Sequence, residues 1–199
     1  MRKMIQAAML LMCTVLPTIV FAGVAVGDPQ GQVTLVEFFD YQCPNCKQMA
    51  PIVDQLIQKN PNLKVVYNDF PFIDSTSTFA ARAGLAAVVQ NKYKDYHDAV
   101  MQASIPLTDD KVMNIAQKIG LNKNQLLNAM GSPAVTAQLK QELETAGAFN
   151  VQATPTFVIF ATNGKAKPTL ITGKTTYDKL QQAINQYAAA APSQSSATK

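Results

Sequence analysis

The sequence predicts an α/β domain in which a βαβ unit and a later ββα unit are separated by an all-helical insertion. Two apolar runs, Val33–Phe39 and Leu63–Asp69, flank a stretch with helical spacing, which is the pattern of a βαβ unit. From residue 75 to about 147 the apolar spacing is helical, without a convincing strand. Strand patterns return at 155–160 and 169–172 and are followed by a last amphipathic helix.

The first 22 residues have the pattern of a signal peptide. Two basic residues precede an almost uninterrupted apolar stretch over 4–21, and small residues lead up to Ala22. We expect residues 1–22 to be removed by cleavage after Ala22. A transmembrane anchor is the alternative, since about 18 apolar residues are borderline for spanning a bilayer. Pro17 and the absence of a stop-transfer flank favour the signal peptide, so residues 23–199 are expected to form one domain in the periplasm.

The composition of the expected processed chain excludes several classes of protein. About 177 residues remain, enough for one sizeable core, and the formal charge falls to about +2. That charge is too small to indicate binding to nucleic acid or to a membrane surface. Cys13 leaves with the signal peptide, so Cys43 and Cys46 are the two cysteines that remain. One closely spaced pair does not make a disulfide-stapled scaffold, although disulfides persist in an oxidising compartment.

The first half of the chain contains the βαβ unit. Residues 23–32 are interpreted as a loose N-terminal segment. The β-branched and aromatic residues of Val33–Phe39 predict a central strand buried on both faces. A helix is expected over 43–59, because an Asn-Pro-Asn sequence follows it, and Leu63–Asp69 is expected to be the second strand.

The second half contains the helical insertion, at about 75–147, and the ββα unit. An Asn-Gly pair at 163–164 between apolar runs predicts a hairpin. A helix is expected over 175–189, and the polar tail at about 192–199 is expected to be disordered. The helices predicted in the insertion are 77–90, 92–102, 109–119, 123–129 and 134–145.

The pair Cys43-Pro44-Asn45-Cys46 is the strongest functional motif in the chain. A thiolate at a helix N-terminus is stabilised by unpaired backbone N–H groups and the helix dipole, with a pKa of about 3.5–7.5 in such sites. Pro44 suits the first helical position. Cys46 lies one turn further in and is more shielded. Cys43 is therefore predicted to be the exposed, attacking sulfur in thiol-disulfide exchange, and Cys46 the sulfur that resolves the mixed disulfide.

A zinc site is the alternative for this pair, but it would need four ligands. The processed chain offers two cysteines and one histidine, His97. We therefore expect neither a metal nor an organic cofactor. His97 is interpreted as a surface or packing residue of the helical insertion rather than a catalytic base, and Lys47 as a solvated helix residue.

Two segments resemble signatures of the thioredoxin superfamily. CPNCKQMAP, residues 43–51, looks like the active-site helix of that superfamily, with a proline inside the helix. ATPTF, residues 153–157, resembles its cis-proline loop. The resemblance implies a thioredoxin-like fold in which Pro155 follows a cis peptide bond, faces the dithiol and belongs to both the catalytic and the substrate-binding site. Thr154 is expected to tune the dithiol through its hydroxyl and to bind substrate through its backbone; a plain turn residue is the alternative for Thr154.

The sequence FFDYQCPNC, the YNDFP segment after the second strand and the helical insertion are similar to DsbA-type exported thiol-disulfide oxidoreductases. This resemblance implies catalysis of disulfide formation in reduced or unfolded exported proteins. A DsbB-like or DsbD-like membrane protein is the expected redox partner, and a monomer is favoured over an oligomer. Alternatives are a disulfide isomerase or reductase on the same fold, and a non-enzymatic peptide-binding chaperone.

Two further residues are candidates for control of the dithiol. Many DsbA proteins have His where this chain has Asn45, which keeps hydrogen-bonding capacity without the charge. We therefore predict a disulfide that is less oxidising than in those proteins and more oxidising than in thioredoxin. Glu37 lies inside an apolar strand, where the resemblance places a buried acid that exchanges a proton with Cys46. The alternative is an exposed strand edge with a solvated Glu37.

Overall fold

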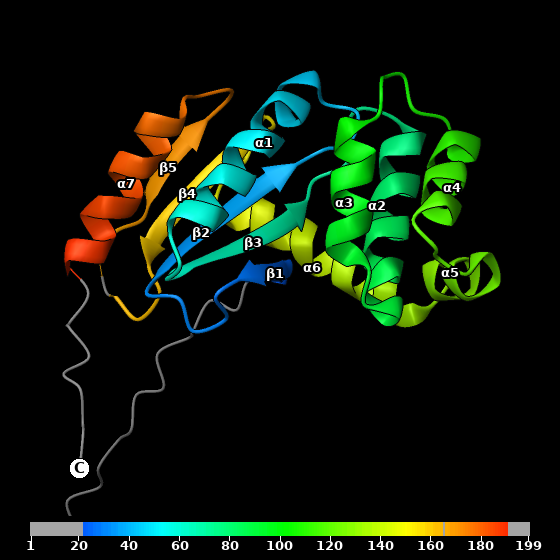
Figure 1. Cartoon of the computed structure of the whole chain (residues 1–199), viewed down its shortest axis with the longest axis horizontal. Helices are drawn as coiled ribbons and strands as arrows, with labels where there is room; N and C mark the ends of the chain where they lie inside the picture. Colours follow the sequence, from blue (N-terminus) through cyan, green and yellow to red (C-terminus); the bar gives the residue numbers. More distant parts are fainter. Residues whose placement is uncertain (1–21, 165, 191–199) are drawn as a thin grey trace, which may run out of the picture.

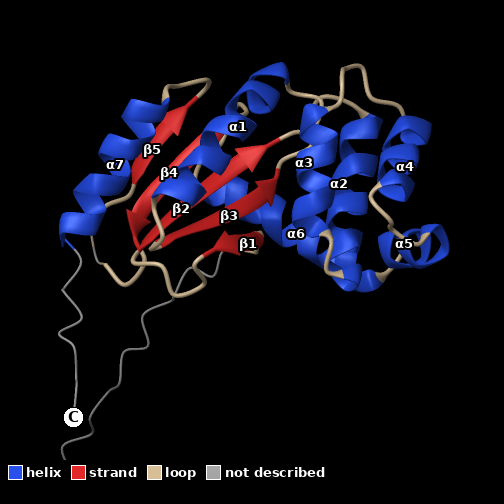
Figure 2. Cartoon of the chain, in the orientation of Figure 1, coloured by secondary structure: helices blue, strands red, loops and turns tan. Residues whose placement is uncertain are grey.

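The computed structural model describes residues 22–164 and 166–190. The expected signal peptide, apart from Ala22, and the expected disordered tail lie outside the described residues. A single mixed sheet forms the centre of the molecule, with helices on both faces and a helical block beside it (Figures 1 and 2). None of the described helices combines the length and apolar character needed to cross a bilayer.

The sheet has the strand order β1-β3-β2-β4-β5. β2 and β3 are parallel, as expected for a βαβ unit, whereas the other three pairings are antiparallel. The predicted βαβ and ββα units are confirmed. The interpretation of residues 23–32 as a loose segment is wrong in its first part, because an edge strand forms there. The strands are β1 Val24–Gly27, β2 Val33–Phe39, β3 Leu63–Asp69, β4 Thr156–Ala161 and β5 Thr169–Thr172.

All five helices predicted between β3 and β4 are present, within a few residues of their expected bounds. At the N-termini of four of these helices a side chain accepts a hydrogen bond from a backbone N–H of the first turn, as Asp74 does from Ser77 N and Ser132 from Val135 N, whereas the helix that starts at Tyr93 has no such cap. Helix α1 continues through Pro51. The helices are α1 Pro44–Lys59, α2 Ser75–Ala87, the 3₁₀ turn η1 Val88–Gln90, α3 Tyr93–Gln102, α4 Asp109–Lys118, α5 Lys123–Met130, α6 Pro133–Ala148 and α7 Tyr177–Ala190.

Strand β2 is buried along its whole length because both faces of the sheet are covered. Alternate side chains point to opposite faces. Leu35 and Phe39 join the larger core cluster with α1, α3 and α7, whereas Val36 and Phe38 pack in a smaller cluster with residues of α6. Glu37 therefore projects to the same face as Leu35 and Phe39, beneath the helix that carries the two cysteines.

Candidate active site

The two cysteines lie where β2 gives way to α1. Cys43 is the N-cap of α1, with extended backbone angles, and its N–H donates to the carbonyl of Asp40 over 3.0 Å. Pro44 is the first helical residue, and the first turn contains no acidic side chain. The unpaired N–H groups of this turn therefore surround the Cys43 sulfur without a competing negative charge.

Cys43 is held in its thiolate form at neutral pH. Its pKa is lowered from 9.0 to about 6, first by the hydrogen bond from the Cys46 thiol and then by Thr154 and the backbone N–H groups of Cys46 and Asn45; partial burial opposes these effects. About nine in ten Cys43 side chains are then ionised at pH 7. The side chain is 5% exposed, and its neighbours Pro44 and Asn45 are exposed.

Cys46 has the opposite character. It is fully buried, and burial, the hydrogen bond to Cys43 and the negative charge of Glu37 raise its pKa far above the usual value. The difference in acidity supports the prediction that Cys43 attacks and Cys46 resolves. Both cysteines are free thiols in this structure.

The loop before β4 faces the dithiol. The Thr154–Pro155 peptide bond is cis, which confirms the implication of the sequence resemblance, and Ile105–Pro106 is a second cis bond that the sequence did not predict. In the protonated form of Cys43, its thiol donates to the Thr154 carbonyl over 3.3 Å. The buried Thr154 hydroxyl makes no other hydrogen bond with the described residues, so it is free to donate to the ionised sulfur.

Glu37 is a buried acid beneath the dithiol. Its side chain is 1% exposed, so the alternative of a solvated strand edge is wrong. Burial is the largest cause that raises its pKa from 4.5 to about 8, and the negative charges of Asp54 and Cys43 contribute to the same shift. One carboxyl oxygen, Oε1, has no hydrogen-bond partner among the described residues. Glu37 therefore titrates in the range in which a proton can be exchanged near neutral pH.

A family model for the DSBA-like thioredoxin domain matches residues 34–185. The chain belongs to this family. It is 37% identical to a thioredoxin-like oxidoreductase from Silicibacter pomeroyi, with a TM-score of 0.78 over 85% of this chain and 94% of that chain. A periplasmic thioredoxin-like protein from Salmonella enterica serovar Typhimurium is 28% identical, with a TM-score of 0.74 over 86% of this chain and 92% of that chain.

The chain is also similar to part of some longer curated proteins. The Na⁺/H⁺ antiporter NhaA 3 of Salinispora tropica is 25% identical over 135 residues, which are 67% of this chain and 21% of the antiporter. This chain thus spans about a fifth of the length of such relatives. The predicted thioredoxin-like fold and the DsbA-type resemblance are confirmed, and with them the expectation of a thiol-disulfide oxidoreductase fold with its two thiols close together.

Asp40 organises the helical side of this DSBA-like site; its place just before the motif suggested a position at the rim of the site but not its hydrogen bonds. Its carboxylate accepts from Gln42 N over 2.8 Å and from the Ser77 hydroxyl over 2.7 Å. It also accepts from the backbone N–H groups of Phe72 and Ile73, over 3.0 and 3.2 Å. The loop that leads into α2 is therefore fixed next to Cys43, with Phe72 and Ile73 exposed.

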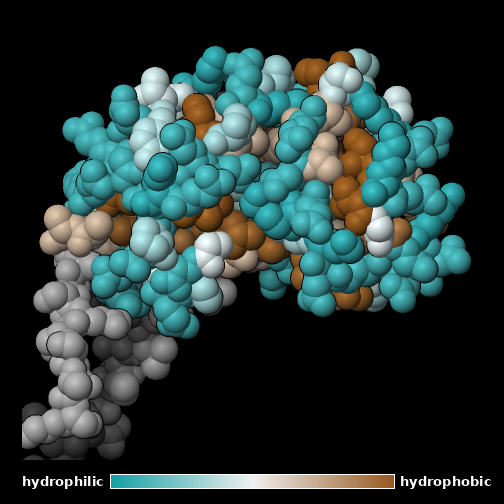
Figure 3. Space-filling model, in the orientation of Figure 1, coloured by the Kyte–Doolittle hydropathy of each residue, from teal (hydrophilic) through white to brown (hydrophobic). Residues whose placement is uncertain are grey.

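Gln42 connects a second loop to the site. Its Oε1 accepts from the Leu107 N–H over 2.7 Å, and its Nε2 donates to Asp74. The first contact fixes the loop around the cis Ile105–Pro106 bond, where Ile105 is exposed. Hydrophobic side chains reach the surface at the upper edge of the molecule beside the start of α1 (Figure 3). The one sequence signal for both residues was their polar character beside the motif, in Asp40-Tyr41-Gln42-Cys43.

One interpretation from the sequence needs correction, and a second is narrowed to one of its two alternatives. Lys47 is not simply a solvated helix residue: its Nζ donates to the Val100 carbonyl near the end of α3 over 2.7 Å, and burial lowers its pKa to about 8. His97 is not at the surface but packs against Phe39 and Tyr67. Burial lowers the pKa of His97 to about 3, so the ring is neutral. No group of three potential metal ligands occurs in the part of the chain that the structure describes.

Proposed function

We propose that this chain is an exported thiol-disulfide oxidoreductase that forms disulfides in reduced exported proteins, with Cys43 and Cys46 as its redox pair. The observation that carries the proposal is the contrast between an acidic Cys43 at a helix N-terminus and a protonated, buried Cys46. A low thiol pKa stabilises the reduced enzyme, which makes its disulfide the stronger oxidant.

The reaction begins with the Cys43–Cys46 disulfide. A substrate thiolate attacks the Cys43 sulfur, the bond between Cys43 and Cys46 breaks, and Cys46 leaves with the electron pair. Cys46 takes a proton from Glu37, whose raised pKa keeps a proton available. A second substrate thiolate then attacks the substrate sulfur and releases Cys43 as a thiolate. The substrate loses two electrons, and the enzyme is left reduced.

The surroundings of Cys43 suit a polypeptide substrate. The exposed side chains of Phe72, Ile73 and Ile105 offer apolar surface beside the thiol, and the backbone before Pro155 can pair with an extended peptide. Pro44 and Asn45 are proposed to tune the redox potential through the helix start. We place the potential between those of thioredoxin and the DsbA proteins that have His in place of Asn45.

The proposal includes an exported location, a redox partner and a domain division. The leader pattern of residues 1–22 and the similarity to a periplasmic thioredoxin-like protein support export to the periplasm. A DsbB-like membrane protein would reoxidise the enzyme, and a DsbD-like one would instead keep it reduced. We propose that residues 23–199 act as one monomeric domain.

Isomerase activity is the second candidate function, because the exposed apolar residues beside Cys43 could also hold a misfolded chain.

The redox state of the dithiol in cells tests the proposed direction. Cells are quenched with acid, and free thiols are alkylated with a reagent that changes the mobility of the protein. We expect a mostly oxidised Cys43–Cys46 pair. A mostly reduced pair would contradict the oxidase and support the isomerase or reductase. Retained suppression of aggregation in Cys43→Ser, together with no redox activity in the parent protein, would support the chaperone alternative.

A further inference from the structure

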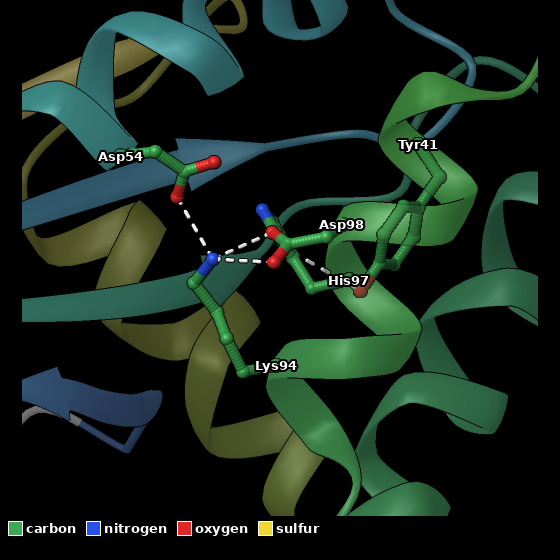
Figure 4. Close-up of polar contacts among 5 residues, drawn as sticks. All are labelled: Tyr41, Asp54, Lys94, His97 and Asp98. Atoms are coloured by element: carbon green, nitrogen blue, oxygen red, sulfur yellow. Dashed lines mark hydrogen bonds and ion pairs between the residues drawn. The ribbon is translucent and has the colours of Figure 1, made fainter. Parts of the chain in front are cut away.

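A charged cluster joins the helix of the dithiol to the helical block. Lys94 on α3 donates from Nζ to Asp54 Oδ1 on α1 over 2.8 Å and to both carboxylate oxygens of Asp98 over 2.6 Å (Figure 4). The three side chains are 31–35% exposed. Two carboxylates share one ammonium, so the cluster carries a net negative charge close to α1.

Buried contacts lead from this cluster to Glu37. Glu37 and Tyr67 are paired in register on the neighbouring strands β2 and β3. The rings of Tyr67 and His97 are 4.1 Å apart between centroids, and His97 precedes Asp98 in α3. Figure 4 shows Lys94 joined to Asp54 and Asp98, and the neighbouring His97 joined to Tyr41. The His97 Nδ1 lies 3.4 Å from the Tyr41 hydroxyl.

Polar atoms along these contacts lack partners. Glu37 Oε1, the Tyr67 hydroxyl and His97 Nε2 are all buried and make no hydrogen bond with the described residues. The Glu37 carboxyl is thus poorly screened, and a nearby charge acts on it with little attenuation. Tyr67 from β3 and the apolar Phe157 from β4 are paired in register with Glu37. The charges of Asp54 on α1 and of Cys43 act on Glu37, and the charge of Glu37 acts on Cys46. On α3, Lys94 is bonded to Asp54, Asp98 is bonded to Lys94, and His97 lies against Tyr67.

We propose that Asp54 and Lys94 are positioning residues for the acid–base chemistry of Glu37. The negative charge of Asp54 favours the protonated form of Glu37, and the Lys94 ammonium limits this effect. His97 is neutral, so it adds no charge to this balance. The inference rests on the proposed function, in which Glu37 gives its proton to Cys46 when the disulfide breaks. The cluster then determines the fraction of enzyme molecules in which Glu37 is protonated at a given pH.

Two substitutions in this ion cluster should shift the pKa of Glu37 in opposite directions. Asp54→Asn removes a like charge and should lower the pKa of Glu37. Lys94→Met leaves two carboxylates without a cation and should raise it. We expect shifts of roughly 0.5 to 1 pH unit, below the range of about 1–3 for charges in direct contact. The carboxyl is titrated by carbon-13 NMR, with Glu37→Gln to assign its signal, and the rate of disulfide reduction is measured over the same pH range.

Control variants separate charge from packing. Lys94→Arg keeps the charge and should restore the parental titration. Lys140→Met removes the cation of an exposed pair with Glu144 on α6, on the opposite face of the sheet, and should leave Glu37 unchanged. If the cluster served only to hold α1 against α3, Asp54→Asn and Lys94→Met would shift Glu37 in the same direction or not at all, and either result overturns the inference.

The experiment also distinguishes this inference from the role of Glu37 itself. If Glu37→Gln leaves the rate of disulfide reduction unchanged at every pH, the proposed proton transfer fails and the inference fails with it. If Glu37→Gln slows the reaction while neither Asp54→Asn nor Lys94→Met shifts the titration, the proton transfer stands and the inference alone is overturned.

Discussion

The acidity of Cys43 should depend strongly on the thiol of Cys46. The pKa of Cys43 falls from 9.0 to about 6, and the hydrogen bond from Cys46 is the largest cause. The whole shift corresponds to roughly 4 kcal/mol. One hydrogen bond to a charged group contributes about 1.5–3 kcal/mol, or about one to two pH units. Cys46→Ala should therefore raise the pKa of Cys43 to roughly 7–8.

The pH dependence of alkylation measures this change. In the processed Cys46→Ala protein, Cys43 is the remaining thiol, and in the parent Cys46 stays protonated. At pH 6 the ionised fraction of Cys43 should fall from about one half to roughly 1–10%, so that iodoacetamide reacts about 5- to 50-fold more slowly. Cys46→Ser keeps a hydroxyl donor and should show a smaller shift. A midpoint that stays near pH 6 in Cys46→Ala would refute the reasoning.

Three further predictions concern charge, proton binding and loop anchoring. Asn45→His adds a cation at the helix start and should lower the pKa of Cys43 and raise the redox potential, measured against glutathione; an unchanged potential would contradict this. The folded protein retains a proton on Glu37 between about pH 4.5 and 8, so its stability should fall as the pH rises through this window. The free energy of unfolding in urea should depend less on pH for Glu37→Gln than for the parent. Equal slopes of this free energy against pH would argue against a buried acid. Gln42→Ala leaves the Leu107 N–H without its acceptor and should destabilise the fold by about 1–3 kcal/mol, in contrast to an exposed control such as Gln48→Ala.

Most of the fold could be predicted because its patterns are long and local. Val33–Phe39 is continuously apolar, and the helices of the insertion have clear caps and breakers. Strand β1 could not be predicted in the same way. It has four residues and pairs antiparallel with β3, which lies some 40 residues later. The stability of so short an edge strand comes from that pairing rather than from its own sequence.

In the candidate site, too, the residues with local sequence signals could be predicted and those with distant partners could not. Cys43 and Cys46 were predictable because helix position and spacing act over four residues. The contact of Lys47 with Val100 and that of Asp54 with Lys94 join α1 to α3 across 53 and 40 residues. A charged residue on a helix looks solvated from sequence alone, because nothing local identifies its distant partner. For the same reason, the sequence left His97 as either a surface or a packing residue, and only the structure shows that it packs in the core.

The contact between the Cys43 thiol and the Thr154 carbonyl spans 111 residues of sequence. As the polypeptide is synthesised from its N-terminus, both cysteines emerge long before the loop that covers Cys43 exists. A nascent chain that ends before β4 thus carries two thiols without the acceptor and hydroxyl of Thr154. Contacts of such long sequence separation form late in folding. The full reactivity of the dithiol therefore belongs to the completed molecule.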